Sequence, residues 1–275
     1  MPELPEVETV CRALKPLLEG RKFAAITLRR QNLRFPFPPS FAARLKNQKV
    51  KNVGRRAKYI LIHLMNHETL IIHLGMSGRL TIQNKKTPPL KHDHVIIELD
   101  SGQNLVFNDA RRFGLMDLAA TKTLESHQLF NHLGIEPLSP RFNAGKLAAW
   151  FKNKKTAVKL ALLDQRGVVG VGNIYASEAL YHAGISPKRM AGQVKLPELK
   201  RLAPAIKKTL RRSIKAGGSS LRDYRQVDGE LGWFQDGFAV YDRAGLGCPG
   251  CFCADKVKKI IQGGRSTFYC PKKQS

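Results

Sequence analysis

The pattern of apolar residues changes once along the chain, and this change constrains the fold more than any other feature. Between residues 23 and 118 the apolar residues form short, partly alternating runs that are separated by turn residues. Runs of this length and spacing are typical of the strands of a β-sandwich or barrel. From residue 146 to residue 216 the apolar residues recur with a helical period. The sequence therefore predicts an α+β chain, with a β domain followed by helices.

The two ends of the chain add a helix and a small module. Apolar residues at helical spacing between Val7 and Leu18 predict a first helix, which stops at Gly20. The proline-containing segment 134–141 is typical of a linker, and the C-terminal tail mixes short β-like runs with cysteines. We therefore expect three domains, over residues 1–130, 131–235 and 236–275.

The chain is strongly basic. Its 275 residues include 47 Lys and Arg against 21 Asp and Glu, which gives a formal net charge of +26 and a pI near 10.2. Such an excess of one charge opposes compactness and favours a polyanionic partner. Nucleic acid is the leading candidate, because each neutralised phosphate releases a counterion. A membrane is not expected, since the sequence has no purely basic amphipathic helix, no membrane-length apolar run and no signal peptide.

Four of the five cysteines lie in the last 28 residues. In a chain without an export signal, this crowding predicts a metal site rather than disulfides, and a cytoplasmic location. Cys248, Cys251, Cys253 and Cys270 provide four sulfurs, which is the number of ligands that a structural zinc ion prefers. The Cys-x-Cys step from Cys251 to Cys253 is tight, so three thiolates plus water, or no metal, are alternatives.

The chain starts with Met-Pro, and two carboxylates follow closely. Removal of Met1, which a small second residue permits, exposes the secondary amine of Pro2. An α-amino group titrates near pH ~7.7–8.0, so a nucleophilic fraction is present at neutral pH. Its attack on the sugar carbon that carries the base displaces the base and, as the sugar opens, gives a cationic iminium, which favours loss of neighbouring phosphates. Glu3 or Glu6 is suited to general acid–base work, although acids in a first helical turn also complement the helix dipole.

Motifs along nearly the whole chain resemble one family, in that family's order. They are PELPEVETV from Pro2, GRRAKY from Gly54, IHLGMSG from Ile72, KHDHV from Lys91, DARRFG from Asp109, VVGVGNIYASE from Val168 and QGGRSTFYC from Gln262. Together they resemble the formamidopyrimidine-DNA glycosylases, the oxidised-purine branch of the family that includes endonuclease VIII. The resemblance implies an N-terminal β-sandwich, a helix–two-turns–helix DNA-binding domain and a C-terminal zinc-finger-type β-hairpin.

The resemblance also assigns roles to residues of this chain. Pro2 is the Schiff-base nucleophile, and Glu3 is the proton donor that opens the sugar. Lys58 assists β-elimination, and Arg265 assists δ-elimination and grips phosphate. The segment 219–224 resembles a mobile loop that closes over the damaged base. Residues that match the wedge and the other DNA contacts are Met76, Arg111, Phe113, His92, Lys155 and Asn173, with Lys155, Thr156 and Lys159 expected on the helix before the glycine-rich turn.

Plain structural roles compete with several of these assignments. Met76 and Phe113 are also compatible with core positions, and Lys58 with a solvated lysine at the end of a strand. His94 is a nearby competitor of His92. The cysteine pattern departs from the family's, because Lys273 stands where the last cysteine of the second Cys-x2-Cys pair belongs.

We expect a monomeric glycosylase and lyase, with one zinc ion per chain, that acts on double-stranded DNA. Its substrates would be duplexes containing 8-oxoguanine, formamidopyrimidines or abasic sites. Two alternatives stay open at this point. One is an enzyme of the endonuclease VIII type that prefers oxidised pyrimidines. The other is a DNA-binding protein that keeps the DNA clamp but has lost the chemistry.

Overall fold

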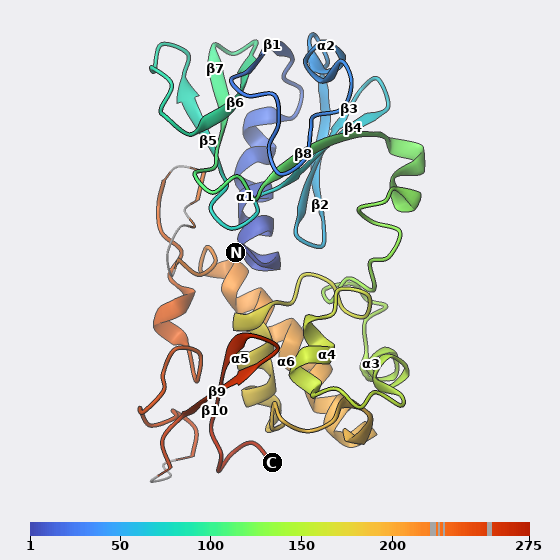
Figure 1. Cartoon of the computed structure of the whole chain (residues 1–275), viewed down its shortest axis with the longest axis vertical. Helices are drawn as coiled ribbons and strands as arrows, with labels where there is room; N and C mark the ends of the chain where they lie inside the picture. Colours follow the sequence, from blue (N-terminus) through green and yellow to red (C-terminus); the bar gives the residue numbers. More distant parts are fainter. Residues whose placement is uncertain (221–223, 225, 228, 252–254) are drawn as a thin grey trace. The chain divides into compact units, whose positions relative to one another are not determined.

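The computed structural model describes residues 1–220, 224, 226–227, 229–251 and 255–275 (Figure 1). The chain forms two compact units, one of residues 1–131 and 216–233 and the other of residues 132–215 and 234–275. The expected boundaries at 130 and 235 stay a prediction. In the described part of the chain, no helix combines the length and apolar character that crossing a bilayer requires.

The N-terminal unit contains two four-stranded antiparallel sheets, ordered β1-β6-β7-β5 and β2-β3-β4-β8 (Figure 1). Apolar residues of both sheets share one core with α1 (Leu4–Leu18). The expected α+β class and N-terminal β-sandwich are therefore confirmed. The strands are β1 (Phe23–Leu28), β2 (Val50–Arg56), β3 (Tyr59–Leu64), β4 (Glu68–His73), β5 (Arg79–Asn84), β6 (Asp93–Leu99), β7 (Gln103–Asn108) and β8 (Leu115–Ala120).

Strand β2 is the strand that the alternation of apolar residues does not reveal. It buries Val50 and Val53, which are three residues apart, and exposes the residues between them. A register shift between Val50 and Asn52 against β3 interrupts the period of two. A strand with such an irregularity carries no clean alternating signal. The short helices α2 (Phe41–Leu45) and η1 (Thr121–Ser126) were not expected either.

The second unit contains the predicted helices and the C-terminal hairpin. The helices are α3 (Ala144–Phe151), α4 (Val158–Leu163), α5 (Asn173–Ala183) and α6 (Leu196–Lys215), with the single turns η2 (Ala191–Gln193) and η3 (Phe234–Gly237). The hairpin pairs β9 (Lys258–Gln262) with β10 (Arg265–Tyr269). Its two-residue Gly-Gly turn has φ of +53° and +71°, which is the backbone that such tight hairpin turns require.

The tail is fastened to α5 by a buried carboxylate. Both oxygens of Glu178 accept backbone N–H groups, from Ala239, Val240 and Tyr241, at 2.8–2.9 Å. Burial raises the pKa of Glu178, and these hydrogen bonds act against that rise. The cysteine-containing tail is therefore packed in one unit with the helices.

Candidate functional site

The first turn of α1 gives the two N-terminal carboxylates different surroundings. The Glu3 N–H donates to Glu6 Oε2 (2.7 Å), and the Ser219 N–H donates to Glu6 Oε1 (2.9 Å). Both oxygens of Glu6 are thus engaged by backbone donors, while the Glu3 side chain is part of the same capping box, in which it faces the Glu6 backbone. Glu3 lies next to the buried Pro2, whereas Met1 is 50% exposed and accessible for removal.

A segment from the end of the N-terminal unit closes against this turn. Gly218 has φ +86°, and a Cβ there would lie 3.1 Å from Glu6 Cγ. Tyr224 Oη lies within hydrogen-bond distance of the backbone oxygens of Glu6 (3.4 Å) and Gly217 (3.2 Å). The segment expected to form a loop over the base, residues 219–224, thus begins and ends beside the first turn of α1. Its residues 221–223 lie outside the described residues.

Lys58 lies in the two-residue turn between β2 and β3 and is only 7% exposed. This burial rules out a solvated lysine at the end of a strand. Arg55 fixes the turn, because its Nη1 donates to the Ala57 oxygen (2.7 Å) and its Nε donates to Glu8 on α1 (3.0 Å). The turn and the start of α1 lie at the same end of the N-terminal unit (Figure 1).

The chain start opens into a pocket that also contains the expected wedge. The pocket has a volume of about 550 Å³. It is lined by Met1, Leu33, Arg34, His73, Gly75, Met76, Arg111, Arg112 and Phe113. Met76 is 36% exposed and Phe113 is 44% exposed, so neither is a core residue. The Arg111 guanidinium lies 5.0 Å from the centre of the Phe113 ring. The sequence thus identified three of the residues that this pocket brings together.

Two loops that carry these residues are braced against each other. Asp109 Oδ1 accepts a hydrogen bond from Ser77 Oγ (2.5 Å), and its Oδ2 accepts one from the Gly114 N–H (2.8 Å). Gly75 has φ +63°, and a Cβ there would lie 2.4 Å from the Gly114 nitrogen. The Met76 loop and the Phe113 loop therefore touch backbone to backbone, which only glycine permits.

His73 is a pocket residue that the sequence reasoning missed. Its Nδ1 accepts the Gly75 N–H (3.0 Å), so its proton lies on Nε2 when the ring is neutral. Burial, and then the charges of Lys58 and Arg34, lower the pKa of His73 to about 4. A neutral imidazole among cations suits an anionic ligand, because the remaining N–H can donate to it. The sequence feature that could have identified His73 was its position in the IHLGMSG motif, three residues before Met76.

The two histidines of the KHDHV motif differ in their surroundings. His94 is buried, and its Nε2 lies 2.8 Å from the backbone carbonyl oxygen of Asp109. His92 is partly exposed, with its ring 6.2 Å from that of His94. The structural role therefore falls to His94, which leaves His92 as the candidate for a surface contact.

In the second unit, α4 begins later than expected. Its N-cap Ala157 has an extended backbone, so Lys155 and Thr156 lie in the turn before the helix, and Lys155 is exposed. Lys159 does lie on α4, as expected, but its side chain is 0% exposed. The Lys159 side chain therefore packs in the interior of the second unit and is not available for a surface contact.

Asn173 and Arg265 occupy neighbouring elements of the second unit. Asn173 is the first residue of α5, and its Nδ2 donates to the Ser266 oxygen (2.9 Å) and lies 3.4 Å from Tyr241 Oη. Arg265 starts β10 directly after the Gly-Gly turn, and its side chain is exposed. The amide of Asn173 therefore holds the residue that follows Arg265.

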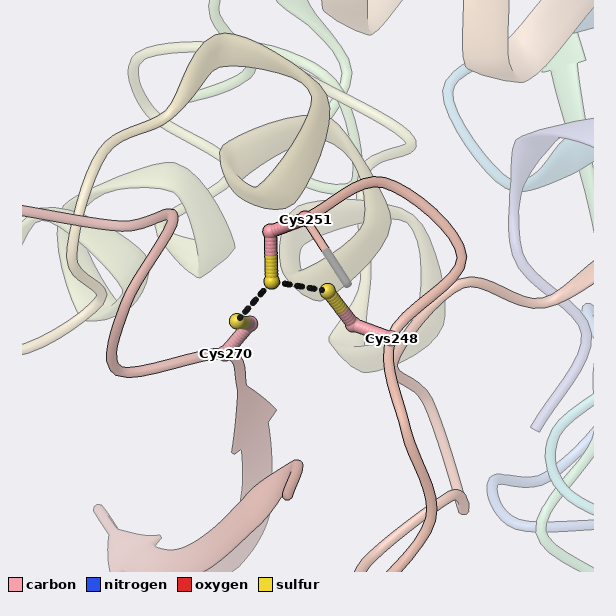
Figure 2. A group of neighbouring side chains, drawn as sticks. All are labelled: Cys248, Cys251 and Cys270. Carbon is pink, nitrogen blue, oxygen red and sulfur yellow. Dashed lines mark hydrogen bonds between the residues drawn. The ribbon is translucent and has the colours of Figure 1, made fainter. Parts of the chain in front are cut away.

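Three of the four candidate metal ligands converge at the end of β10 (Figure 2). Cys251 Sγ lies 3.0 Å from Cys248 Sγ and 3.5 Å from Cys270 Sγ. Burial acts to raise the pKa of Cys248, but the neighbouring Cys251 thiol and Tyr181 hydroxyl lower it to about 6. Burial raises the pKa of Cys270. Three cysteine sulfurs this close to one another fit part of a zinc site. Cys253 lies outside the described residues.

Lys273 closes the side of the cluster where the family pattern has its last cysteine. Its backbone N–H donates to Cys270 Sγ (3.5 Å). Its ammonium lies 4.3 Å from the centre of the Tyr181 ring, and a Cβ on Gly250 would meet this ammonium at 2.5 Å. A cation thus packs beside the loop that joins Cys248 to Cys251.

Two family models match the chain. Residues 1–116 match the formamidopyrimidine-DNA glycosylase N-terminal domain, and residues 133–225 match the formamidopyrimidine-DNA glycosylase H2TH domain. A formamidopyrimidine-DNA glycosylase of Jannaschia sp. is 52% identical over 98% of this chain and 99% of its own length.

Solved structures agree with these matches. A Lactococcus lactis Fpg in complex with Fapy-dG-containing DNA is 31% identical, with a TM-score of 0.90, and the match covers 99% of both chains. A second Lactococcus lactis complex, with DNA that contains an oxidised pyrimidine, is 30% identical, with the same TM-score and coverage.

Proposed function

Since the chain belongs to the formamidopyrimidine-DNA glycosylase family, we propose that it excises oxidised purines from duplex DNA and then cleaves the strand. The observation that carries this proposal is the pocket at the chain start. There the N-terminus, two exposed apolar side chains and several cations face one space. Such a pocket is suited to an extruded nucleotide, because a base must leave the stack before its glycosidic bond can be reached.

In the proposed mechanism, Pro2 attacks after Met1 has been removed. Its nitrogen forms a bond to the sugar C1′, the base leaves with the glycosidic electron pair, and Glu3 protonates the ring oxygen as the sugar opens. The resulting iminium withdraws electrons from the sugar. Loss of a proton from C2′ then breaks the C3′–O bond, and loss of a proton from C4′ breaks the C5′–O bond. Lys58 assists the first elimination and Arg265 the second.

The wedge and the other DNA contacts belong to the same proposal. Met76, Arg111 and Phe113 fill the gap that the extruded nucleotide leaves, since inserted apolar side chains offset part of the cost of unstacking. His92, Lys155 and Asn173 contact the DNA backbone, with the Asn173 contribution made from the N-terminal end of α5. We expect a monomer in the cytoplasm that binds both lesion-containing and abasic duplexes.

We also propose that the cysteine cluster holds one Zn²⁺ ion. Cys248, Cys251 and Cys270 would be its thiolate ligands, with Cys253 or water as the fourth. The ion would stabilise the C-terminal module and would take no part in the chemistry. Metal analysis of the purified protein tests this: about one zinc per chain supports the site, and protein that is folded and free of zinc contradicts it.

Cleavage of two defined duplexes tests the function. One carries a single 8-oxoguanine and the other a single thymine glycol. The proposal predicts faster cleavage of the 8-oxoguanine duplex, and loss of this cleavage in a Pro2→Gly variant. Preference for thymine glycol would favour the oxidised-pyrimidine alternative. The second Lactococcus lactis structure motivates this comparison, because its DNA contains an oxidised pyrimidine. Salt-sensitive binding without cleavage would favour the non-catalytic DNA-binding protein.

A further inference from the structure

Lys159 is a fully buried lysine that the mechanism above does not use. It lies on α4 and is 0% exposed. Its Nζ donates to the backbone carbonyl oxygen of Ser266 (3.1 Å) and to Thr267 Oγ1 (2.6 Å), and both residues lie on β10. Burying an ammonium group is costly unless its donors are satisfied. The buried ammonium group of Lys159 is therefore stable only while the Ser266 and Thr267 oxygens stay within hydrogen-bond distance of it, which ties the position of β10 to that of α4.

The acceptors of Lys159 lie directly after Arg265. Asn173 donates to the same Ser266 oxygen from α5 (2.9 Å). On the other side of Arg265, the hairpin turn rests on α4, since a Cβ on Gly263 would lie 3.0 Å from a methyl group of Leu160. The backbone is thus held immediately before and after Arg265, whereas the Arg265 side chain itself is exposed.

We propose that Lys159 is a positioning residue for Arg265. From α4, 107 positions away in the chain from Ser266, it sets where β10 presents the guanidinium to the phosphate that leaves C5′. This inference rests on the proposed function, because it concerns the second elimination step. A group that grips a leaving phosphate must be placed to within about 1 Å, and a shift of that size costs up to ~10²-fold in rate.

The two elimination steps give different products, which report on Arg265 separately. Base excision and the first elimination use Pro2, Glu3 and Lys58, all of which belong to the N-terminal unit. A misplaced Arg265 should slow only the step in which the C5′–O bond breaks. The ratio of δ-elimination product to β-elimination product is therefore the readout, and a loss of overall stability alone would not change it.

The test uses Lys159→Met, with Lys258→Met as the matched control. Lys258 is an exposed lysine on β9 of the same hairpin, so its variant removes a positive charge but keeps the hydrogen bonds from Lys159 to β10. A duplex with one 8-oxoguanine is cleaved in single turnover, and both products are quantified. We expect the δ-to-β ratio to fall at least 10-fold in Lys159→Met, with excision within about threefold of wild type, and no change in Lys258→Met.

A milder variant keeps the test decisive if Lys159→Met does not fold. Thr267→Val removes one acceptor of Lys159 and nearly preserves the side-chain shape, and it should lower the same ratio by a smaller factor. An unchanged ratio in the folded variants, or a parallel fall of excision and both eliminations, would overturn the inference and leave the proposed function standing. Wild-type protein without excision or lyase activity would overturn both.

Discussion

The start of α1 and the hairpin that carries Arg265 are fixed in two different ways. At the start of α1, the Glu3 N–H and the Glu6 carboxylate are three positions apart, in one helical turn. At the hairpin, Lys159 and Ser266 are 107 positions apart. The first turn that carries the proposed nucleophile thus has a bond within itself besides its long-range contact to Ser219, whereas the proposed phosphate-gripping arginine depends on contacts that exist only after the second unit has folded. Loss of stabilising contacts in the second unit should therefore change the hairpin that carries Arg265 more than the start of α1.

Metal removal should give the largest difference between the two regions. Zinc contributes on the order of 10 kcal/mol in four-ligand zinc-finger peptides, and a three-thiolate site should contribute less. A chelator should therefore speed amide hydrogen exchange in residues 240–275 and leave the core of the β-sandwich unchanged. Equal changes in both units would break the comparison.

Two cysteine-related variants sharpen this prediction. Lys273→Cys should raise zinc affinity, because it adds a fourth thiolate where the family pattern has one. Cys11→Ala should leave metal content unchanged, since Cys11 is buried in the other unit, where its thiol lies 3.2 Å from the Gly54 oxygen.

The two glutamates of the first turn should separate chemistry from scaffold. Glu3→Gln keeps the size of the side chain but removes its proton-donating ability, which should lower single-turnover excision by about 10²–10⁴-fold. Glu6→Gln should lower the melting temperature, because two backbone donors depend on that carboxylate. Its folded fraction should keep excision near the wild-type rate. A reversed pattern, with Glu6→Gln inactive and Glu3→Gln active, would show that the roles have been exchanged.

The pocket histidine should make stability depend on pH. The pKa of His73 is about 4 in the folded chain, against ~6.5 for an unfolded one. Between these values the unfolded state binds more protons, so this contribution to stability is complete above pH ~6.5 and is lost as the pH falls toward 4. From pH 7 to pH 5 the loss is about 2 kcal/mol.

His73→Asn is the control, because its side-chain oxygen can still accept the Gly75 N–H but does not titrate. Urea unfolding at pH 7 and pH 5 measures the difference between the two proteins. Wild type should lose about 2 kcal/mol more than the variant over this range. An equal loss in both would mean that His73 is not held neutral by its surroundings.

Truncation of the wedge should give the smallest effect. Met76→Ala removes an exposed side chain, so stability should hardly change. If Met76 offsets part of the cost of unstacking, excision of 8-oxoguanine should fall about 10-fold, or ~1.4 kcal/mol. Cleavage at a ready-made abasic site should fall less, since no base has to be extruded. Equal losses on both substrates would remove the wedge role.

Local patterns in the sequence predicted most of the fold and the motif residues. Alternating runs predicted seven of the strands, and helical periods predicted α1, α3, α5 and α6 within a few residues. The irregular β2 was missed because its two buried valines do not alternate. Residue type and spacing alone left Glu3 and Glu6 as alternatives for acid–base work, and only the family resemblance favoured Glu3. The contact between Glu6 and the Ser219 N–H exists only in the folded chain.

Long-range contacts were beyond the reach of these patterns. The sequence placed Lys159 on the correct helix but did not predict its burial, because lysine is rarely buried and the acceptors of Lys159 lie on a hairpin far along the chain. His73 escaped notice for a similar reason: its role depends on the charges of Arg34 and Lys58, which reach it only in the folded unit.

Borohydride trapping on a duplex that contains one 8-oxoguanine tests the central claim most directly. The reagent reduces an iminium to a stable amine, and peptide mapping then locates the cross-link. The account predicts one covalent adduct at residue 2, in protein whose intact mass shows that Met1 has been removed. The same processed protein, bound to the duplex but yielding no adduct or an adduct at a lysine, would contradict it.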